Sequence, residues 1–446
     1  MSFGVRTDEI GSGIGVGERA AERSVPLDGA DPLLLVARLA QCGLFTDHVV
    51  YERPGSWTFA GGVLGEVILE NGTVHARWGD GEPVVSPWSG RPSQALDEAF
   101  RASPLPAWNA YGWIAFEFAG DARGQRLAHL IVPRTEVRIE AGQARVTSVD
   151  AAEAERVAAL LAEPGAPRVG TPAPVDVRVD GDRYRSRVAQ AVAEIGAGLY
   201  QKVIVSRRLP IPFPVDVVST YVHGRTANTP ARSFLLDLSG FQATGFSPEV
   251  LASVDGTGTV MTQPLAGTRA FGRGRDADAA TRRELETDPK EIFEHAVSVR
   301  TSQEELYRVC ETDTVQVTGF MAVKERGSVQ HLGSSVSGLL APGRTSWEAL
   351  DALFPGVTAS GIPKREAIEA IARLEEPRGL YSGAVLAISH DGALDAALVL
   401  RALYSDGSGA WLRAGAGIVT GSTPEREYEE TCEKLSCIAP YVVPAS

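Results

Sequence analysis

Helical periodicity recurs along the chain. Apolar residues return every three or four positions from Tyr184 to Leu199, which predicts a helix from about residue 182 that ends near Gly196 and Gly198. Asp-Pro or Thr-Pro begins several similar runs, as expected where proline occupies the first helical position. The pattern therefore predicts further helices over residues 31–41, 151–162, 217–226, 279–286, 289–310, 345–353, 363–373 and 424–437.

Alternating apolar and polar positions predict the strands. In the run that begins at Lys202, Val203 and Val205 fall on one face, and Ile204 and Ser206 share the other face with Lys202. Many short β-prone runs are separated by turn residues, at a density typical of antiparallel sheet. We expect strands over residues 56–60, 63–69, 73–78, 112–118, 135–139, 202–209, 233–238, 250–254, 315–320, 328–332, 384–389 and 411–418.

These elements do not alternate strictly as strand, helix and strand. The sequence therefore predicts an α+β fold with large, mainly antiparallel β-sheets and peripheral helices. Residues 1–25 are rich in glycine and charge, and we expect a disordered tail there. An N-terminal α+β part follows over residues 26–163. A linker rich in proline and glycine over residues 164–180 leads to the second part, residues 181–443.

Composition narrows the partners and the compartment. The net charge of −13 argues against nucleic acid or an anionic membrane as a partner. The four cysteines form no CxxC pair, which argues against a zinc site or a disulfide framework. No apolar run approaches the ~20 residues that span a bilayer, and the N-terminal residues have no hydrophobic segment of a signal peptide. We expect a cytoplasmic protein.

Two predicted helices each carry a pair of glutamates three residues apart. Glu291 and Glu294 form one pair, and Glu427 and Glu430 form the other. Residues at this spacing project from one face of a helix, so converging helices would bring four carboxylates together. Such a cluster repels itself unless it binds a cation or takes up protons. A hard divalent ion with oxygen ligands fits, and Mg²⁺ also keeps open positions for an anionic substrate.

An alternative reading of these glutamates is structural. The Asp288-Pro289 start would let Glu291 complete a capping box, and the last helix could turn its glutamates to solvent. The capping box does not explain Glu294. The repetition of the spacing in two helices favours the metal site over a solvated charged flank.

Other residues offer acid–base or anion-binding chemistry, each with a structural alternative. Lys202 is a base if burial lowers its pKa, or a surface lysine. Glu249 follows Ser-Pro and is also typical of a turn, and His331 is also typical of a hydrogen-bonded core histidine. Arg401 is either capped at a strand end or placed to hold a carboxylate with two hydrogen bonds. The small residues at 415–417 would let backbone N–H groups approach an anion.

Taken together, the motifs of the second half resemble the chorismate-utilising enzymes, and within them the chain is most similar to the mycobactin-type salicylate synthases of siderophore assembly. Trp88–Pro92 and Gly112–Phe118 extend this resemblance into the N-terminal half. The motifs are Pro264-Leu265-Ala266-Gly267-Thr268-Arg269, Lys290-Glu291-x-x-Glu294-His295, Ser328-Val329-Gln330-His331-Leu332, the run Phe354–Lys364, Arg378-Gly379-Leu380-Tyr381-Ser382-Gly383, Arg413–Ile418 and Glu427-x-x-Glu430-x-x-x-Lys434.

The resemblance implies one compact α+β unit that converts chorismate through isochorismate to salicylate and pyruvate. It implies that Lys202 is the general base, that Glu249 is the general acid, and that Glu294 and Glu430 bind Mg²⁺ with Glu291 and Glu427 in support. The substrate-binding residues that it implies are Tyr381 and Arg401 for the enolpyruvyl carboxylate, Gly267, Thr268, Gly415, Ala416, Gly417 and Lys434 around the ring carboxylate, and His331 and Thr358 facing the ring.

Three alternatives to salicylate synthesis stay open. An isochorismate synthase would stop after the first step, although its relatives differ over residues 354–364. An ammonia-using anthranilate-type synthase generally carries glutamine where this chain has Lys202, so no obligate glutamine amidotransferase subunit is expected. A non-catalytic chorismate-binding protein would not need Lys202 and Glu249. Gln263 departs from the family, which has glutamate before Pro-Leu-Ala-Gly-Thr.

Overall fold

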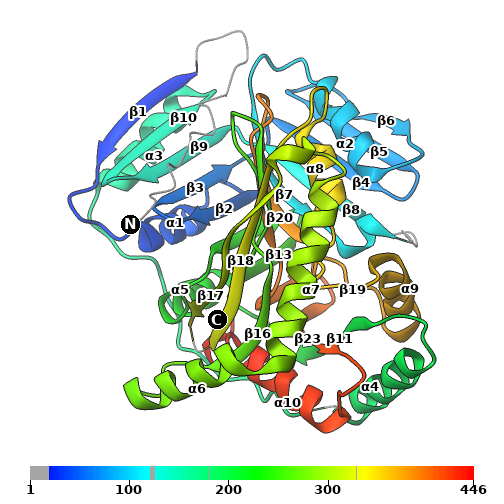
Figure 1. The fold of residues 1–446 in the computed structure, drawn as a ribbon. Helices are drawn as coiled ribbons and strands as arrows, with labels where there is room; N and C mark the ends of the chain where they lie inside the picture. Colours follow the sequence, from blue (N-terminus) through cyan, green and yellow to red (C-terminus); the bar gives the residue numbers. More distant parts are fainter. Residues whose placement is uncertain (1–19, 121–125, 180, 328, 446) are drawn as a thin grey trace.

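The computed structural model describes residues 20–120, 126–179, 181–327 and 329–445. These residues form two large antiparallel sheets (Figure 1). In spatial order, the first sheet comprises β1 (Ala21–Pro26), β10 (Gln143–Ser148), β9 (Thr135–Glu140), β3 (Ser56–Gly61), β2 (His48–Arg53), β12 (Arg232–Leu238), β13 (Phe241–Ser247), β22 (Ala402–Asp406), β23 (Gly409–Ile418), β11 (Lys202–Ile211) and β19 (Gly361–Ile362).

The second sheet likewise combines early and late segments of the chain. Strand β17 (Gln316–Arg326) pairs with β18 off its main path. The other strands, in spatial order, are β16 (Leu265–Ala270), β18 (Val329–Leu339), β15 (Thr259–Thr262), β14 (Val250–Val254), β21 (Leu394–Leu398), β20 (Ala384–Ser389), β7 (Asn109–Ile114), β8 (Arg126–Val132), β4 (Gly65–Glu70), β5 (Thr73–Trp78) and β6 (Val84–Pro87).

The helices lie around these sheets. Short 3₁₀ turns occur at η1 (Phe116–Ala119), η2 (Thr312–Thr314) and η3 (Ala439–Tyr441). The α-helices of the described residues are α1 (Pro32–Gln41), α2 (Pro92–Arg101), α3 (Ala151–Ala162), α4 (Gly181–Gly196), α5 (Val217–Ala227), α6 (Arg275–Thr287), α7 (Pro289–Leu306), α8 (Ser346–Leu353), α9 (Lys364–Leu374) and α10 (Pro424–Leu435). None of these helices combines the length and the apolar character that crossing a bilayer requires.

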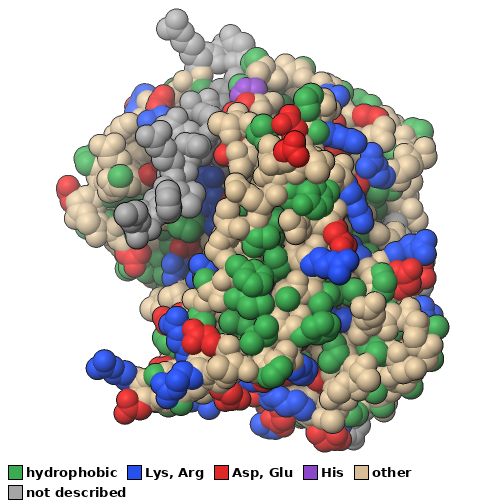
Figure 2. All heavy atoms as spheres, in the orientation of Figure 1, with side chains coloured by type: hydrophobic (Ala, Val, Ile, Leu, Met, Phe, Trp, Pro, Cys, Tyr) green, Lys and Arg blue, Asp and Glu red, His purple; other side chains and the backbone are tan. Residues whose placement is uncertain are grey.

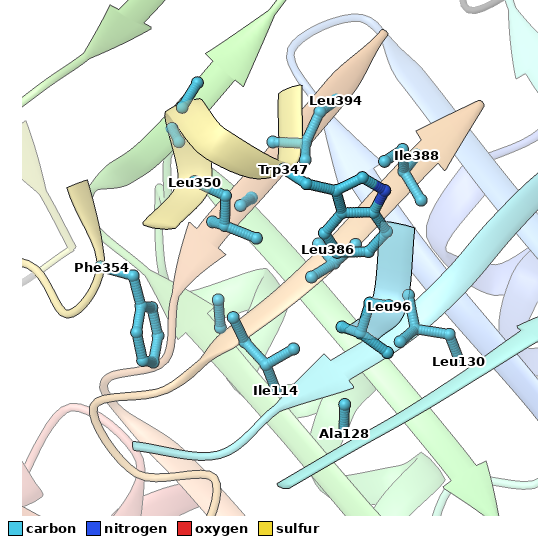
Figure 3. Packing of buried hydrophobic residues seen from close by; sticks show 14 of the residues in the cluster. Leu96, Ile114, Ala128, Leu130, Trp347, Leu350, Phe354, Leu386, Ile388 and Leu394 are labelled. Atoms are coloured by element: carbon cyan, nitrogen blue, oxygen red, sulfur yellow. The ribbon is translucent and has the colours of Figure 1, made fainter. Parts of the chain in front are cut away.

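Apolar side chains fill the space between the two sheets and the space under the helices. One cluster joins the inner faces of both sheets and includes Phe234 on β12 and Val385 on β20. Another lies between the second sheet and helices α2 and α8, where Trp347 packs against Leu386 (Figure 3). Helices α4, α9 and α10 cover the outer face of β11 and β23. Only the inner face of these two strands is therefore left to line a site.

A buried ion pair also links the sheets. Arg232 on β12 and Asp395 on β21 approach to 2.6 Å, and the hydroxyl of Tyr51 donates to the same carboxylate at 2.6 Å. Burial alone would raise the pKa of Asp395, but the Arg232 charge outweighs it and lowers that pKa. Because every charge in this cluster has a hydrogen-bonded partner, it can lie in the interior.

The α+β fold that the sequence predicts is confirmed, and each predicted helix is present. Strands from both sides of residues 164–180 share both sheets, so the predicted division into two parts is a division of the sequence and not of the sheets. Residues 164–179 contain no helix or strand. Residues 1–19 of the predicted tail lie outside the described residues.

Two local predictions are wrong. The expected tail reaches residue 25, but β1 begins at Ala21 and pairs with β10, because Val25 packs into the apolar cluster under α1 and α3. The expected strand over residues 112–118 ends at Ile114 and continues as the 3₁₀ turn η1. In a strand, Phe116 and Phe118 would share one face. In the turn they point apart and enter two different apolar clusters.

Candidate active site

A cavity of about 490 Å³ opens on the inner face of β11 and β23. Residues of the second sheet and of the N-terminal turns of α7 and α10 complete its walls. Nearly all the residues that the sequence singled out line this cavity. They are Lys202, Glu249, Gly267, Thr268, Glu291, Glu294, His331, Thr358, Tyr381, Arg401, Gly415, Gly417, Glu427, Glu430 and Lys434.

Ala416 is the exception: it does not line the cavity, and the contact predicted for it is through its backbone and not its side chain. Successive side chains of a strand point to opposite faces. Gly415 and Gly417 therefore face the cavity, while Ala416 is fully buried in the cluster under α4, α9 and α10. Gln263, the departure from the family pattern, does not line the cavity; its side chain lies 3.4 Å from the Ser335 hydroxyl.

Helix α7 turns one side to the cavity and the other to solvent. The Asp288 carboxylate accepts from the backbone N–H groups of Lys290 and Glu291 and so caps this helix after a proline start. Glu291 does not complete the capping box; its carboxylate pairs with Arg269 at 2.9 Å. Phe293 lies on the opposite side and is exposed. Figure 2 shows hydrophobic side chains gathered in the middle of the face where Figure 1 draws β17, β18 and α7.

The two glutamate pairs face one cavity and repel one another. Burial raises the pKa of Glu291, and the nearby Glu294 and Glu430 charges raise it further. Burial also raises the pKa of Glu427, and Glu430 adds to this effect. Three cations offset the repulsion: Lys202 lies 2.6 Å from Glu294, Lys434 lies 2.8 Å from Glu430, and Arg269 contacts Glu291.

The donor set fits a hard divalent cation in its chemistry. Four carboxylates supply oxygen ligands only, as Mg²⁺ prefers, and the raised pKa values of Glu291 and Glu427 mean that a cation in the cavity would relieve an existing repulsion. Within the described ranges, no three such side chains are already gathered closely enough to hold a metal ion. Glu294 and Glu430 would exchange their lysine partners for the ion.

Glu249 is a buried carboxyl group between β13 and β14. Its residue is 5% exposed, and burial raises its pKa to about 8. The Thr358 hydroxyl lies 2.8 and 3.0 Å from the two carboxylate oxygens and opposes this rise. Near neutral pH the group is therefore mostly protonated and able to give up a proton, which a turn residue exposed to water would not be.

Lys202 begins β11 and is 4% exposed, so the surface alternative is wrong. Its side chain crosses the cavity wall beside Gly417. A β-carbon at position 417 would lie 3.3 Å from Lys202 Cε and 3.4 Å from a Glu294 oxygen. The absence of a side chain at Gly417 therefore leaves the room in which this ion pair forms.

Arg401 and His331 form a directional contact. Arg401 Nη2 lies 2.6 Å from His331 Nε2, and a guanidinium can only donate. The proton of the imidazole is therefore on Nδ1, which lies 3.0 Å from the Thr268 hydroxyl and 3.2 Å from the Gly267 carbonyl. Burial, followed by the Arg401 charge, lowers the pKa of His331 well below its usual range, so the ring is neutral.

Lys434 and Tyr381 also line the cavity. Lys434 donates to the Gly415 carbonyl at 2.9 Å as well as to Glu430. The Tyr381 hydroxyl would lie 3.0 Å from a β-carbon at position 415, so glycine is needed there. Burial raises the pKa of Tyr381, and its hydroxyl remains a donor at neutral pH. The cavity thus offers several donors to carboxylates and four carboxylates to a cation.

A family model for chorismate binding enzymes matches residues 49–440. The chain belongs to this family. Its match covers both sheets apart from β1 and the first residue of β2, and it covers every residue named above as lining the cavity.

Individual relatives agree with this assignment. The chain is 48% identical to the salicylate synthase of Mycolicibacterium paratuberculosis over 94% of its own length and 96% of that protein. It is 35% identical to the anthranilate synthase component 1 of Streptomyces coelicolor, over 95% of its length and 80% of the relative. The menaquinone-specific isochorismate synthase of Escherichia coli has the same fold, with a TM-score of 0.76 at 21% identity over 95% of this chain and 94% of the other.

The cavity also contains cations that are not among the predicted site residues. Arg269 pairs with Asp288 at 2.6 Å and with Glu291, and Lys290 and Arg426 line the cavity beside the glutamate pairs. A signal for the last two was present in the sequence. Each pair is preceded directly by a basic residue, Lys290 before Glu291 and Arg426 before Glu427.

Proposed function

We propose that this chain is a Mg²⁺-dependent salicylate synthase that converts chorismate through isochorismate to salicylate and pyruvate. One observation carries the proposal: a buried lysine and a buried glutamate, Glu249, line the same cavity as four further carboxylates. A base, an acid and a cation site are the parts that this reaction requires. The 48% identity to a salicylate synthase over nearly the full length of both chains supports this product over isochorismate.

In the first step, water adds at ring C2 and the hydroxyl leaves from C4. Lys202 takes a proton from the attacking water, and Glu249 gives a proton to the departing hydroxyl, so the ring double bonds shift and one water replaces another. The new charge on Lys202 develops in the cavity that holds the glutamate pairs, whose negative charge stabilises it. Burial keeps Glu249 protonated until the step, and Thr358 holds its carboxyl group in place.

In the second step, isochorismate loses pyruvate. The hydrogen on C2 moves to the methylene carbon of the enolpyruvyl group while the bond between C3 and oxygen breaks, which leaves aromatic salicylate. This transfer lies within the substrate and needs positioning more than a base. Tyr381 and Arg401 would hold the enolpyruvyl carboxylate, and His331 fixes Arg401 from behind.

Mg²⁺ held by Glu294 and Glu430, with Glu291 and Glu427 in support, would supply the positive charge that binds the ring carboxylate. Lys434, Thr268 and the backbone at Gly267, Gly415 and Gly417 would surround that carboxylate. Water and not ammonia is the nucleophile in this scheme. The chain therefore needs no glutamine amidotransferase subunit to supply ammonia.

The test is product analysis with the purified chain. Chorismate and Mg²⁺ are incubated with the protein, and the products are resolved by chromatography, with a metal-chelated sample as the control. Equal amounts of salicylate and pyruvate, lost on chelation, are expected. Isochorismate alone would instead identify an isochorismate synthase, and unchanged chorismate would identify a binding protein without catalysis.

A further inference from the structure

Three buried charges lie together at the cavity wall, and one of them, Arg413, also lines the cavity. The side chains of Glu375 and Arg378 are fully buried, and that of Arg413 is 2% exposed. Glu375 lies 3.1 Å from Arg378 and 2.9 Å from Arg413. Burial alone would raise the pKa of Glu375, but the two arginine charges outweigh it and lower the pKa to about 2. A buried ion cluster is weak evidence for added stability, so the contacts that it makes decide its role.

Every N–H donor of Arg378 has an acceptor. Nε and Nη2 donate to Glu375, and Nη2 also donates to the Ile204 carbonyl at 2.7 Å. Nη1 donates to the Ala359 carbonyl at 2.8 Å and lies 3.4 Å from the Ser382 hydroxyl. A guanidinium is planar and offers its five donors in fixed directions. Arg378 therefore fixes the relative positions of three segments of backbone, which are its own segment and those of Ile204 and Ala359.

Two of these segments carry the acid–base groups of the site. Ile204 lies on β11 two residues after Lys202, and Ala359 follows Thr358, whose hydroxyl contacts Glu249. Glu375 adds a second hold on β11, because the backbone N–H and the hydroxyl of Ser206 both donate to its carboxylate. Arg378 thus connects the strand of the base to the partner of the acid.

Arg413 extends the same cluster to the third wall of the cavity. It lies on β23 two residues before Gly415 and donates to Ser206, Glu375 and the backbone carbonyls of Glu376 and Pro377. Arg413 also lines the cavity, but these acceptors already take up its guanidinium donors.

We propose that Arg378 is a positioning residue for the water-addition step, in which it sets the separation between Lys202 and Glu249 through the Ile204 and Ala359 carbonyls. The inference rests on the proposed function. The base acts at C2 and the acid at C4 in one event, so the distance between them matters. A displacement of ~1 Å between reacting groups costs on the order of 10²-fold in rate.

The two-step reaction offers a test that distinguishes a positioning role from general damage to the fold, because general damage would slow both steps. Loss of pyruvate from isochorismate uses neither Lys202 nor Glu249. Arg378→Lys keeps the positive charge but loses the fork, so kcat with chorismate should fall by about 100-fold with KM nearly unchanged. The same variant, supplied with isochorismate, should release salicylate at close to the wild-type rate.

Arg232→Lys is the matched control. Arg232 is a buried arginine with a paired carboxylate, Asp395, but it does not line the cavity. The Arg232→Lys variant should have a lower melting temperature, but its rates with chorismate and with isochorismate, per folded molecule, should match those of the wild type. Glu375→Gln keeps the shape of the cluster, removes its negative charge, and should slow the chorismate step selectively; it serves if Arg378→Lys does not fold.

Equal losses of rate with both substrates would overturn the positioning role. They would show that the substitution damages the fold or disturbs Tyr381, whose ring centre lies 5.7 Å from the Arg378 guanidinium. Unchanged rates with chorismate would overturn it as well. If the wild-type chain does not convert isochorismate, the second step of the proposed function fails, and the split between kcat and KM with chorismate still decides the role of Arg378. A wild-type chain that consumes no chorismate would overturn both proposals.

Discussion

The ammonium group of Lys202 lies 2.6 Å from a carboxylate oxygen of Glu294, across the space that Gly417 leaves open. Burial alone would raise the pKa of Glu294, but Lys202, together with Lys290 and Lys434, lowers it. The proposed base, Lys202, and a proposed metal ligand, Glu294, therefore form an ion pair in which each influences the charge of the other. A change at either residue alters the charge of the other, which shapes the experiments on both.

Lys202→Gln should remove water addition and leave the fold intact. The amide can still hydrogen-bond to Glu294 but cannot accept a proton from water, so turnover of chorismate should fall by ~10²–10⁴-fold. Chromatography measures the turnover, and a thermal melt checks the fold. Lys324→Gln, at an exposed lysine outside the cavity lining, is the control and should retain wild-type activity. Wild-type turnover in Lys202→Gln would remove Lys202 from the mechanism.

Glu430→Ala should raise the Mg²⁺ concentration needed for half-maximal activity. The substitution removes one proposed ligand and also frees Lys434, which lies 2.8 Å away, to repel the ion. The measurement is the rate against total Mg²⁺ at saturating chorismate. The neighbouring Glu429 pairs with Arg178 at the surface, so Glu429→Ala should need the same Mg²⁺ concentration for half-maximal activity as the wild type. An unchanged midpoint in Glu430→Ala would exclude a ligand role for Glu430.

The pH dependence of kcat should report Glu249. A general acid works only while it is protonated, and burial raises the pKa of Glu249 to about 8, so activity should decline as pH rises through about 8. Thr358 lowers this pKa by bonding to the carboxylate. In Thr358→Val the descending limb should therefore move to higher pH. A limb that stays in place, or moves to lower pH, would assign it to another group.

The sequence was enough to find most of the site because each motif carries several chemically informative residues. The pairs Glu291/Glu294 and Glu427/Glu430 follow from helical spacing alone, and the structure brings both to one cavity. The two-residue period of β23 also accounts for the side chain of Ala416, which points away from the cavity. The contacts of Arg378 could not have been foreseen, because Ile204 and Ala359 are remote in sequence and meet it only through sheet pairing.

The fold likewise has elements that the sequence predicts locally and elements that depend on remote neighbours. Helices with a proline start and an acidic cap, such as α7, are specified locally and were predicted. Strand β1 was missed because an edge strand needs its partner, β10, more than it needs a pattern of its own. The placement of β2 beside β12, across the segment 164–180, depends on the apolar cluster between the sheets. Periodicity within one segment carries no information about such a neighbour.

Gly267→Ala should weaken Mg²⁺ binding indirectly, through the Glu291 side chain. Gly267 has a φ of 78° at a bulge in β16, and a β-carbon there would lie 2.9 Å from Glu291 Oε2 and 3.2 Å from Leu285. The backbone strain should lower the free energy of unfolding by about 1–3 kcal/mol. The contact should also displace the Glu291 carboxylate and raise the Mg²⁺ requirement.

Gly272→Ala separates these two effects. Gly272 has a similar φ of 81°, but a β-carbon there would meet nothing within 4 Å. It should therefore share the loss of stability in a denaturant titration and keep the wild-type Mg²⁺ dependence. If both variants raise the Mg²⁺ requirement equally, strain in this segment accounts for the effect. The close approach of Gly267 to Glu291 would then have no part in holding the ion.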